Sequence, residues 1–385
     1  MAKQSPFMLM EEYLINNYNF QYNVVLNRVA NIQGRTKKVT YLDDYGLNSL
    51  WVELQRASMQ ISKESVLNYL YSSQSTRFDP FKSYFDALPP WTPDQPDYIS
   101  MLADTITVSE DSRANWNLYL RRWLIASVAC ATDPEITNQQ VLTLVGEQGL
   151  GKTKWIEKLV PTKLKDYSYS GNVNPGDKDS SINLSECFLI NLDELGNLNK
   201  GDLNTLKQLI TLSSVRIRRP YAAMAEKMPR RASFAGSVNN MEFLRDDTGN
   251  RRYLCVESQV IDYNHNIDMD LVYAQAYYLL SQGEKHWFDG EEVAAINAAN
   301  DKYRVQQVEL EFVNEFFEPC LANEQPDMEL TTTGIQAYLL KQHVPITNIN
   351  PIRLGKALMA SDYVRVKKNG GTYYYKLKLK RQSAS

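Results

Sequence analysis

Cysteine is scarce in this chain, and its four cysteines are widely separated. Cys130, Cys187, Cys255 and Cys320 form no C-x-x-C pair among 385 residues. This spacing argues against a zinc ribbon or a disulfide framework and favours a reducing compartment. Long apolar runs are also lacking, since no stretch approaches the ~18 apolar residues of a membrane span and the N-terminus has no secretory apolar segment. We expect a soluble protein of a reducing cytoplasm with no membrane partner.

An overall positive charge is missing as well. The net charge is −3, but its distribution is uneven: residues 257–329 hold sixteen acids against three bases, whereas residues 214–231 hold six bases and one acid. Residues 352–381 hold nine bases and one acid. Two basic patches on an acidic body leave DNA binding open, because local fields decide the partner.

One motif organises the chain. The apolar run Val141–Val145 predicts a strand, a glycine loop follows, and Lys154–Leu159 predicts a helix. The spacing G-x-x-x-x-G-K-[ST] is that of a P-loop, whose backbone N–H groups cradle phosphates at a helix N-terminus. The predicted ATP-binding residues are Gly146, Glu147, Gln148, Gly149, Leu150, Gly151, Lys152 and Thr153. Lys152 would reach the β- and γ-phosphates, and the Thr153 hydroxyl would bind Mg²⁺.

A second apolar run, residues 187–192, ends in Asp193-Glu194 and predicts a Walker B strand. A strand beside the P-loop strand would bring Asp193 to the Mg²⁺ site, and Glu194 would polarise the attacking water. The alternative is an ordinary strand followed by a helix-capping acidic pair. A third strand over residues 231–238 ends at Asn239, which is either a sensor that holds the nucleophilic water or part of a plain turn.

Basic residues cluster between the second and third strands. They flank a tip of small residues, which predicts a projecting hairpin that contacts DNA phosphates, or alternatively a solvated basic face. The candidate contacts here are Arg218, Arg219, Lys227, Arg230 and Arg231. Further along, Arg251 and Arg252 precede a strand. One of them would act as an arginine finger in a neighbouring subunit, unless they form a structural ion pair with Asp246 or Asp247.

The remaining segments predict the domain organisation. Residues 1–95 are interpreted as a helical domain ending in a linker, because five prolines lie between positions 80 and 96. Residues 96–256 would be the ATPase core, 257–329 an acidic helical block, and 330–385 a winged helix with a hairpin turn at Asn369-Gly370. The winged helix would contact DNA or, alternatively, a protein. Its candidate DNA contacts are Arg353, Lys356, Lys367 and Lys368.

Together these segments resemble the virulence-associated protein E family: phage and mobile-element ATPases related to the superfamily 3 helicases and to the helicase part of poxvirus-type helicase-primases. The resemblance spans about residues 110–256. The segments that carry it are Leu120-Arg121-Arg122-Trp123-Leu124-Ile125, Gly146–Thr153, Asp177-Lys178-Asp179, Leu192-Asp193-Glu194-Leu195, Arg219-Pro220-Tyr221, Pro229-Arg230-Arg231 and Gly249-Asn250-Arg251-Arg252.

The resemblance implies an α/β fold with an AAA+ type core that assembles into a ring, usually a hexamer, and moves on DNA using ATP. It assigns Asn239 as the sensor and Arg251 or Arg252 as the finger. Two motifs differ from the family pattern. Tyr253-Leu254-Cys255 replaces the usual aromatic-Trp-Pro, so both arginines remain candidates, and Trp91-Thr92-Pro93 replaces Trp-Asp-Gly. No zinc ligands or acidic triad mark a primase domain upstream.

We therefore expect an ATP-driven DNA helicase or replication initiator of a phage or mobile element, working with single-stranded or forked DNA and possible replication proteins. The alternative is a DNA-binding regulatory ATPase that loads or blocks replication proteins without unwinding. A purely structural assembly protein with ATP as a fixed ligand fits poorly, because Glu194 keeps hydrolysis available.

Overall fold

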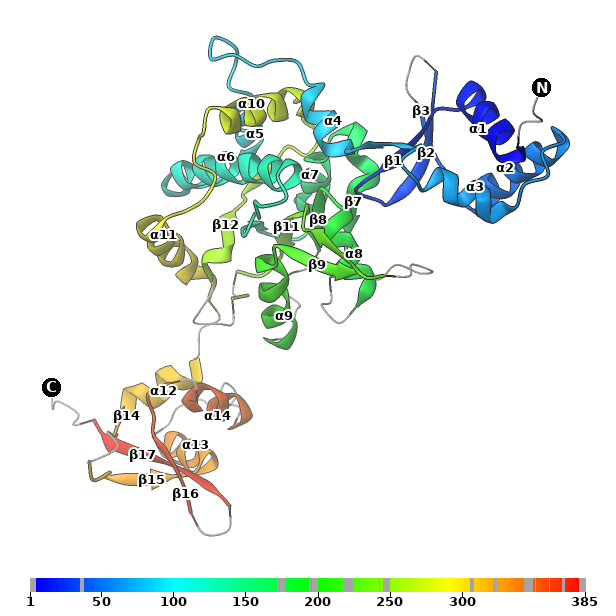
Figure 1. Cartoon of the computed structure of the whole chain (residues 1–385). Coiled ribbons are helices and arrows are strands. Elements are labelled where there is room, and N and C mark those ends of the chain that lie inside the picture. The colour runs from blue at the N-terminus through cyan, green and yellow to red at the C-terminus, as the bar shows by residue number, and fades with distance from the viewer. Residues whose placement is uncertain are drawn as a thin grey trace. The chain divides into compact units, whose positions relative to one another are not determined.

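A parallel five-stranded sheet lies at the centre of the larger part of the computed structural model (Figure 1). The chain divides into two compact units, Met1–Arg304 and Val305–Ser385. The structure describes residues 5–34, 38–171, 173, 177–193, 195, 200–217, 224–241, 243–244, 250–304, 308–320, 324–342, 349, 351–359, 361–368 and 371–380.

The central sheet has the strand order β12-β6-β11-β8-β7, with every pair parallel. Most of its strands are short apolar runs buried on both faces, as parallel strands covered by helices must be. Their bounds are β6 (Val141–Val145), β7 (Ser168–Ser170), β8 (Leu189–Leu192), β11 (Ser233–Val238) and β12 (Tyr253–Glu257). The predicted α/β fold is confirmed, and its central sheet is parallel.

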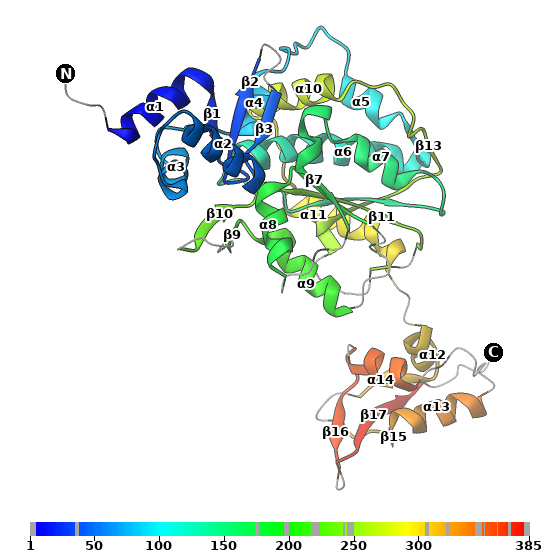
Figure 2. The same cartoon turned by 90° about the vertical axis from the view of Figure 1, so that its right-hand side faces the viewer.

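Alternating side chains of these strands supply two separate cores, one on each face of the sheet (Figure 2). Leu142 and Leu144 pack on the side that carries α4 (Pro80–Asp86), α5 (Tyr98–Ala103), α6 (Glu110–Thr132), α7 (Lys152–Lys158) and α10 (Met269–Ser281). Val141 and Val145 pack on the side that carries α8 (Lys178–Glu186) and α9 (Lys200–Thr211). The sheet is therefore a rigid platform between helical layers.

The first part of the proline-rich stretch after residue 79 forms a helix and not the linker that the composition predicts. Asp79 caps helix α4 through its side chain, and Pro80 takes the first helical position, where a missing N–H costs nothing. Phe81, Tyr84 and Phe85 of this helix are buried in the core beside the sheet. Only Pro80 lies in this helix, and the other four prolines follow it in residues 87–97, which contain no helix or strand.

The N-terminal segment is also more than helical. It contains a four-stranded sheet in the order β3-β2-β1-β4, where β1 and β4 run parallel. Three helices cover a core of their own that includes Leu14, Leu50 and Leu70. The bounds are α1 (Pro6–Asn17), β1 (Phe20–Asn23), β2 (Arg28–Gln33), β3 (Lys38–Tyr41), α2 (Asp44–Arg56), α3 (Lys63–Leu70) and β4 (Thr76–Phe78). The expected helical domain is thus corrected to one that contains both helices and a sheet.

Smaller elements complete the larger unit. They are β5 (Ile106–Thr107), η1 (Thr162–Tyr167), β9 (Ser214–Ile217), β10 (Glu226–Pro229), η3 (Asn250–Arg252), β13 (Val260–Ile261), α11 (Gly290–Asn300) and η4 (Asp301–Tyr303). The strand β13 pairs with β5, so the chain returns after β12 to the region of the P-loop.

The smaller unit begins before the predicted winged helix. Its elements are α12 (Val308–Phe316), β14 (Phe317–Pro319), β15 (Met328–Leu330), α13 (Thr332–Lys341), α14 (Pro351–Met359), β16 (Arg365–Lys367) and β17 (Tyr373–Leu379). The two predicted helices and the hairpin are present, with β16 antiparallel to β17. Val313 and Phe317 share their core, so the expected acidic block of residues 257–329 is split between the two units.

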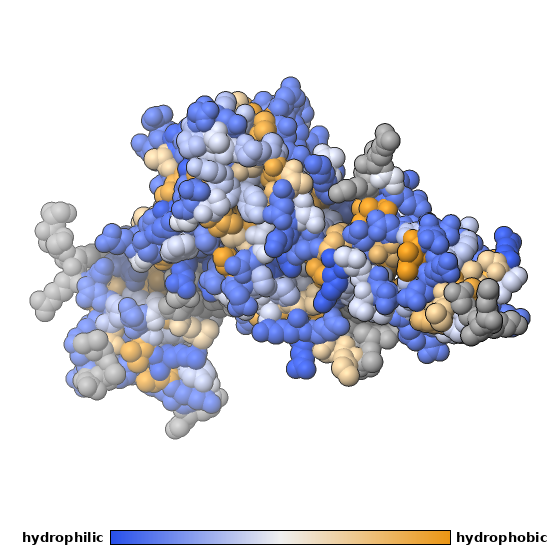
Figure 3. Space-filling view, turned by 45° about the horizontal axis from the view of Figure 1, so that its top comes forward, coloured by the Kyte–Doolittle hydropathy of each residue, from blue (hydrophilic) through white to orange (hydrophobic). Residues whose placement is uncertain are grey.

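Apolar surface is dispersed on the face drawn in Figure 3, where hydrophilic residues predominate and hydrophobic ones form small groups. Among the residues that the structure describes, no helix combines the length and the hydropathy that crossing a bilayer requires.

Candidate nucleotide site

The P-loop has the expected strand, loop and helix. The strand β6 ends at Val145 and α7 begins at Lys152, so the glycine loop spans residues 146–151. Gly149 and Gly151 have φ of +91° and +86°, a region that favours glycine. A Cβ on Gly151 would lie 2.1 Å from Cδ1 of Tyr263, so glycine is also required there by a close neighbour.

Lys152 is held inside this loop. Its Nζ donates to the carbonyl oxygens of Gly146 and Glu147, each at 2.7 Å. The residue is only 5% exposed. Burial lowers the pKa of the Lys152 ammonium, while the charge of Asp193 acts in the opposite direction. The amine is thus positioned over the loop by the main chain, where it would meet a bound phosphate.

Asp193 comes to the P-loop from β8. Its Oδ1 accepts hydrogen bonds from Oγ1 of Thr153 at 3.2 Å and from Oγ of Ser237 at 3.1 Å. The sequence suggested that β8 lies beside the P-loop strand β6. In the structure β11 lies between them. The prediction that Asp193 and Thr153 meet still holds, because the carboxyl ends of parallel strands share one edge of the sheet.

Ser237 was missed by sequence reasoning. It is buried near the end of β11, two residues before Asn239, and it holds the Asp193 carboxylate from the strand between β6 and β8. Its signal was a hydroxyl at the penultimate position of a strand that is otherwise mostly apolar. Asn239 follows β11 and is exposed at the same edge. Glu194, the other half of the predicted Walker B pair, lies outside the described residues.

The donor set suits Mg²⁺. A hydroxyl and a carboxylate oxygen 3.2 Å apart are hard oxygen ligands, and Mg²⁺ usually takes only one or two protein ligands together with waters and substrate phosphates. In the described part of the chain, no cluster of three or more His, Cys, Asp or Glu side chains offers a cage of its own. Thr153 and Asp193 therefore fit a metal that arrives with a nucleotide.

The two candidate finger residues lie in η3, just before the edge strand β12. Arg251 is exposed, whereas Arg252 is partly buried. Burial, followed by repulsion from Arg251, lowers the pKa of Arg252. The Asn300 side chain fixes this turn by donating to the carbonyls of Asn250 and Tyr253, at 2.9 and 2.8 Å. Asp246 and Asp247, the alternative ion-pair partners, are outside the described residues.

The predicted basic hairpin exists as the antiparallel pair β9 and β10, in which Lys227 faces Arg216. Both residues are exposed. Arg218 and Arg219 lie outside the described residues. Asn27 of the N-terminal region donates to Oε2 of Glu226 at 3.2 Å, so the end of β10 nearest the turn contacts that region.

Arg230 is not available to DNA, which corrects its predicted role. Its side chain is fully buried. Its guanidinium donates to the carbonyls of Leu209, Ile210, Ala232 and Asn138, and it stacks on the ring of Phe234 with 4.9 Å from Cζ to the ring centroid. Burial lowers its pKa to about 10, so it stays charged at neutral pH. Its buried guanidinium thus links α9, the start of β11 and the segment before β6 by hydrogen bonds.

Arg231 is a structural residue too. Its side chain is 11% exposed and forms an ion pair with Asp79, 2.8 Å from Nη2 to Oδ2. It also donates to the carbonyl of Ala131 at the end of α6. This pair ties the cap of α4 to the segment before β11, which the sequence could not indicate because the partners are 152 positions apart.

In the smaller unit, Arg353 and Lys356 lie on α14, but their side chains are outside what the structure describes. Lys367 and Lys368 are exposed on the wing, and Lys368 pairs with Glu329. Arg365 stacks over Tyr373, with 4.4 Å from Cζ to the ring centroid. The wing therefore carries a basic and aromatic surface, partly neutralised at Lys368.

Comparisons with known proteins agree with this arrangement. A model of the virulence-associated protein E-like domain matches residues 88–305, and this match ends where the larger unit ends. Among solved structures, the apo structure of NrS-1 C terminal region (305-718) is similar, with 15% identity and a TM-score of 0.50, covering 97% of this chain and 99% of that one.

Two A form apo structures of the same NrS-1 region have a TM-score of 0.49, at 14% and 15% identity, and each covers 98% of this chain and 100% of its own. At these identities the likeness concerns the fold alone. No curated protein sequence matches the chain.

Proposed function

The chain belongs to the virulence-associated protein E-like domain family, and from that premise we propose that it is an ATP-dependent DNA motor, a helicase or replication initiator of a phage or mobile element. One observation carries the ATPase half of this proposal. The Asp193 carboxylate accepts from the Thr153 hydroxyl at 3.2 Å, beside a P-loop whose lysine is already positioned by two carbonyls. This is the constellation that nucleoside triphosphate hydrolysis needs.

The chemistry assigns a role to each group. Lys152 neutralises charge on the β- and γ-phosphates, and the loop N–H groups hold the phosphate oxygens. Thr153 and Asp193 would hold Mg²⁺, which supplies charge neutralisation between the phosphates. Ser237 fixes the orientation of the Asp193 carboxylate. Glu194 polarises the attacking water, and Asn239 at the same sheet edge orients it.

The strand order supports the finer assignment to an AAA+ type core. In this core β11, which Asn239 follows, lies between the P-loop strand β6 and the Walker B strand β8. The P-loop, Asp193 and Asn239 therefore lie at one edge of the sheet. In the same proposal the smaller unit contains a winged helix, since β15, α13, α14, β16 and β17 follow one another in strand, helix, helix, strand, strand order, after α12 and β14. We propose a ring, with a hexamer as the expected state.

Coupling to DNA is the test of the motor. ATP turnover should rise when single-stranded DNA is added, and both basal and stimulated turnover should fall by about 10²–10³-fold in Glu194→Gln, because a transition-state group is lost. Steady-state phosphate release measures both. Glu194-dependent turnover indifferent to DNA would favour the regulatory ATPase, and strand displacement on a forked duplex separates unwinding from loading. ATP retained in stoichiometric amount without turnover would argue for the assembly protein.

The exposed hairpin lysine should contribute a phosphate contact. We expect Lys227→Ala to weaken DNA binding several-fold for every sequence and to reduce the slope of log K against log salt by about 1, because one fewer counterion is released. Binding titrations at several salt concentrations measure this slope. Lys82→Ala, which removes an exposed lysine from α4, is the matched control. Equal slopes for the two variants would exclude Lys227 from the DNA path.

A further inference from the structure

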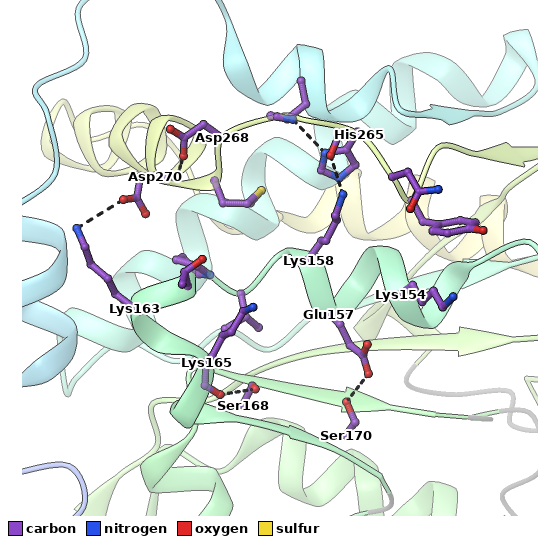
Figure 4. Close-up of a pocket in the computed structure, with 17 residues that line it drawn as sticks. Lys154, Glu157, Lys158, Lys163, Lys165, Ser168, Ser170, His265, Asp268 and Asp270 are labelled. Atoms are coloured by element: carbon purple, nitrogen blue, oxygen red, sulfur yellow. Dashed lines mark hydrogen bonds and ion pairs between the residues drawn. The ribbon is translucent and has the colours of Figure 1, made fainter. Parts of the chain in front are cut away.

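A pocket of about 950 Å³ opens beside the outer side of α7, between that helix, η1 and the segment that leads from β13 to α10 (Figure 4). It begins next to the P-loop, since Lys154 directly follows the metal-binding Thr153 and lines the pocket. Tyr263 lines it from the opposite segment, and its ring rests on Gly151, the last glycine of the loop. The pocket therefore lies next to the loop where phosphates would bind.

The direction of a bound nucleotide follows from the groups that fix its two ends. Lys152 and the Thr153–Asp193 pair fix the terminal phosphates, and the N–H groups at the first turn of α7 lie nearest the α-phosphate. The sugar and base must then leave the loop at that first turn. This is where Lys154 and Tyr263 meet, with 5.1 Å from the lysine Nζ to the ring centroid.

The charges that line the pocket nearly balance, which is compatible with an uncharged base and sugar. Glu157, Asp268 and Asp270 line it together with four lysines. Lys158 is tied to the carbonyl of His265 at 2.6 Å, and Lys163 lies 3.6 Å from Asp270. The four lysines therefore exceed the three carboxylates by a single charge, and the lining is close to neutral. Its volume is in the range of small-molecule sites.

One residue that lines the pocket, His265, has a buried ring nitrogen without a hydrogen-bond partner in the described part of the chain. His265 is 7% exposed, and its Nδ1 accepts from the N–H of Ile267 at 3.3 Å, which places the proton on Nε2. Burial, with Lys158 second, lowers the pKa of this imidazole and keeps it neutral. Within the described chain no group accepts from Nε2. An unpaired buried donor is costly, so a ligand acceptor would explain it.

We propose that this pocket receives the base and ribose of the nucleoside triphosphate, with the base stacked on Tyr263 and an acceptor atom of the nucleoside bonded to Nε2 of His265. The exposed Lys154 side chain covers the ring and would move toward the α-phosphate. This inference rests on the proposed function, because it names the nucleoside half of the same site. Tyr263 and His265 are binding residues here, and neither takes part in phosphate chemistry.

The test compares ATP with inorganic tripolyphosphate, which carries the phosphates without the nucleoside. Calorimetry on the full chain with Mg²⁺ gives the two dissociation constants. Wild type should bind ATP at least tenfold more tightly than tripolyphosphate. Tyr263→Ala should weaken ATP binding by about 5- to 100-fold, the range that base stacking covers, and leave tripolyphosphate binding unchanged. Retained tripolyphosphate binding also shows that the loop is folded.

Three further variants sharpen the result. Tyr263→Phe keeps the ring and should bind ATP as wild type does, whereas His265→Phe removes the donor and should weaken ATP alone by about tenfold. Tyr45→Ala, at a tyrosine 81% exposed on α2, is the matched control and should change neither constant. Equal weakening of both ligands in Tyr263→Ala, or no weakening, would overturn this inference. A wild type that binds neither ligand would instead overturn the proposed function.

Discussion

Arg251→Ala should reduce ATP turnover by about 10³-fold or more while leaving ATP binding by the variant nearly unchanged. An arginine finger is worth 10³–10⁵ in turnover because it stabilises charge that develops only in the transition state. Arg251 is the better candidate of the pair: it is exposed before the edge strand β12, while Arg252 is partly buried and its pKa is lowered by that burial. Phosphate release and ATP titration together measure the effect.

Subunit mixing distinguishes a finger in trans from a local role. If Arg251 serves a neighbouring subunit, turnover of wild type mixed with increasing Arg251→Ala should fall below the line expected from the wild-type fraction, and specific activity should rise with protein concentration. Arg251→Lys is the matched variant, because it keeps the charge and loses the planar fork. Strictly proportional mixing curves, with no concentration dependence, would contradict action in trans.

Arg230→Met should destabilise the larger unit by about 3–5 kcal/mol. It removes a fully buried guanidinium that satisfies the carbonyls of Leu209, Ile210, Ala232 and Asn138, and these acceptors would remain buried without a donor. All six tryptophans of the chain lie in residues 1–304, so urea unfolding followed by tryptophan fluorescence reports on this unit alone.

Lys227→Ala is the control for that measurement. It removes an exposed lysine from β10, three residues before Arg230. The free energy of unfolding should stay within about 0.5 kcal/mol of wild type. The two variants therefore separate a structural basic residue from a DNA-contacting one within the same segment. If Arg230→Met unfolded like wild type but bound DNA poorly, the sequence-based assignment of Arg230 to DNA would be restored.

Local chemistry explains which parts of the site could be predicted. A strand, a glycine loop and a helix are consecutive in the chain, so Gly146–Thr153 could be placed from spacing alone. The Asp193–Thr153 contact followed from one more rule, that parallel strands end at a common edge. Ser237 and the interposed position of β11 did not follow, because strand order depends on packing between segments far apart in the sequence.

The sequence by itself determined the elements whose signals are local: the P-loop, the basic hairpin and the two-stranded wing. Tertiary structure alone decided which charges are free and which are buried. Arg230 and Arg231 belong to the same basic run as Lys227, yet the main chain folds carbonyls around the first and brings Asp79 to the second. The sequence shows how many basic residues a segment has. The desolvation of each side chain depends on the groups packed around it, and the fold alone places those groups.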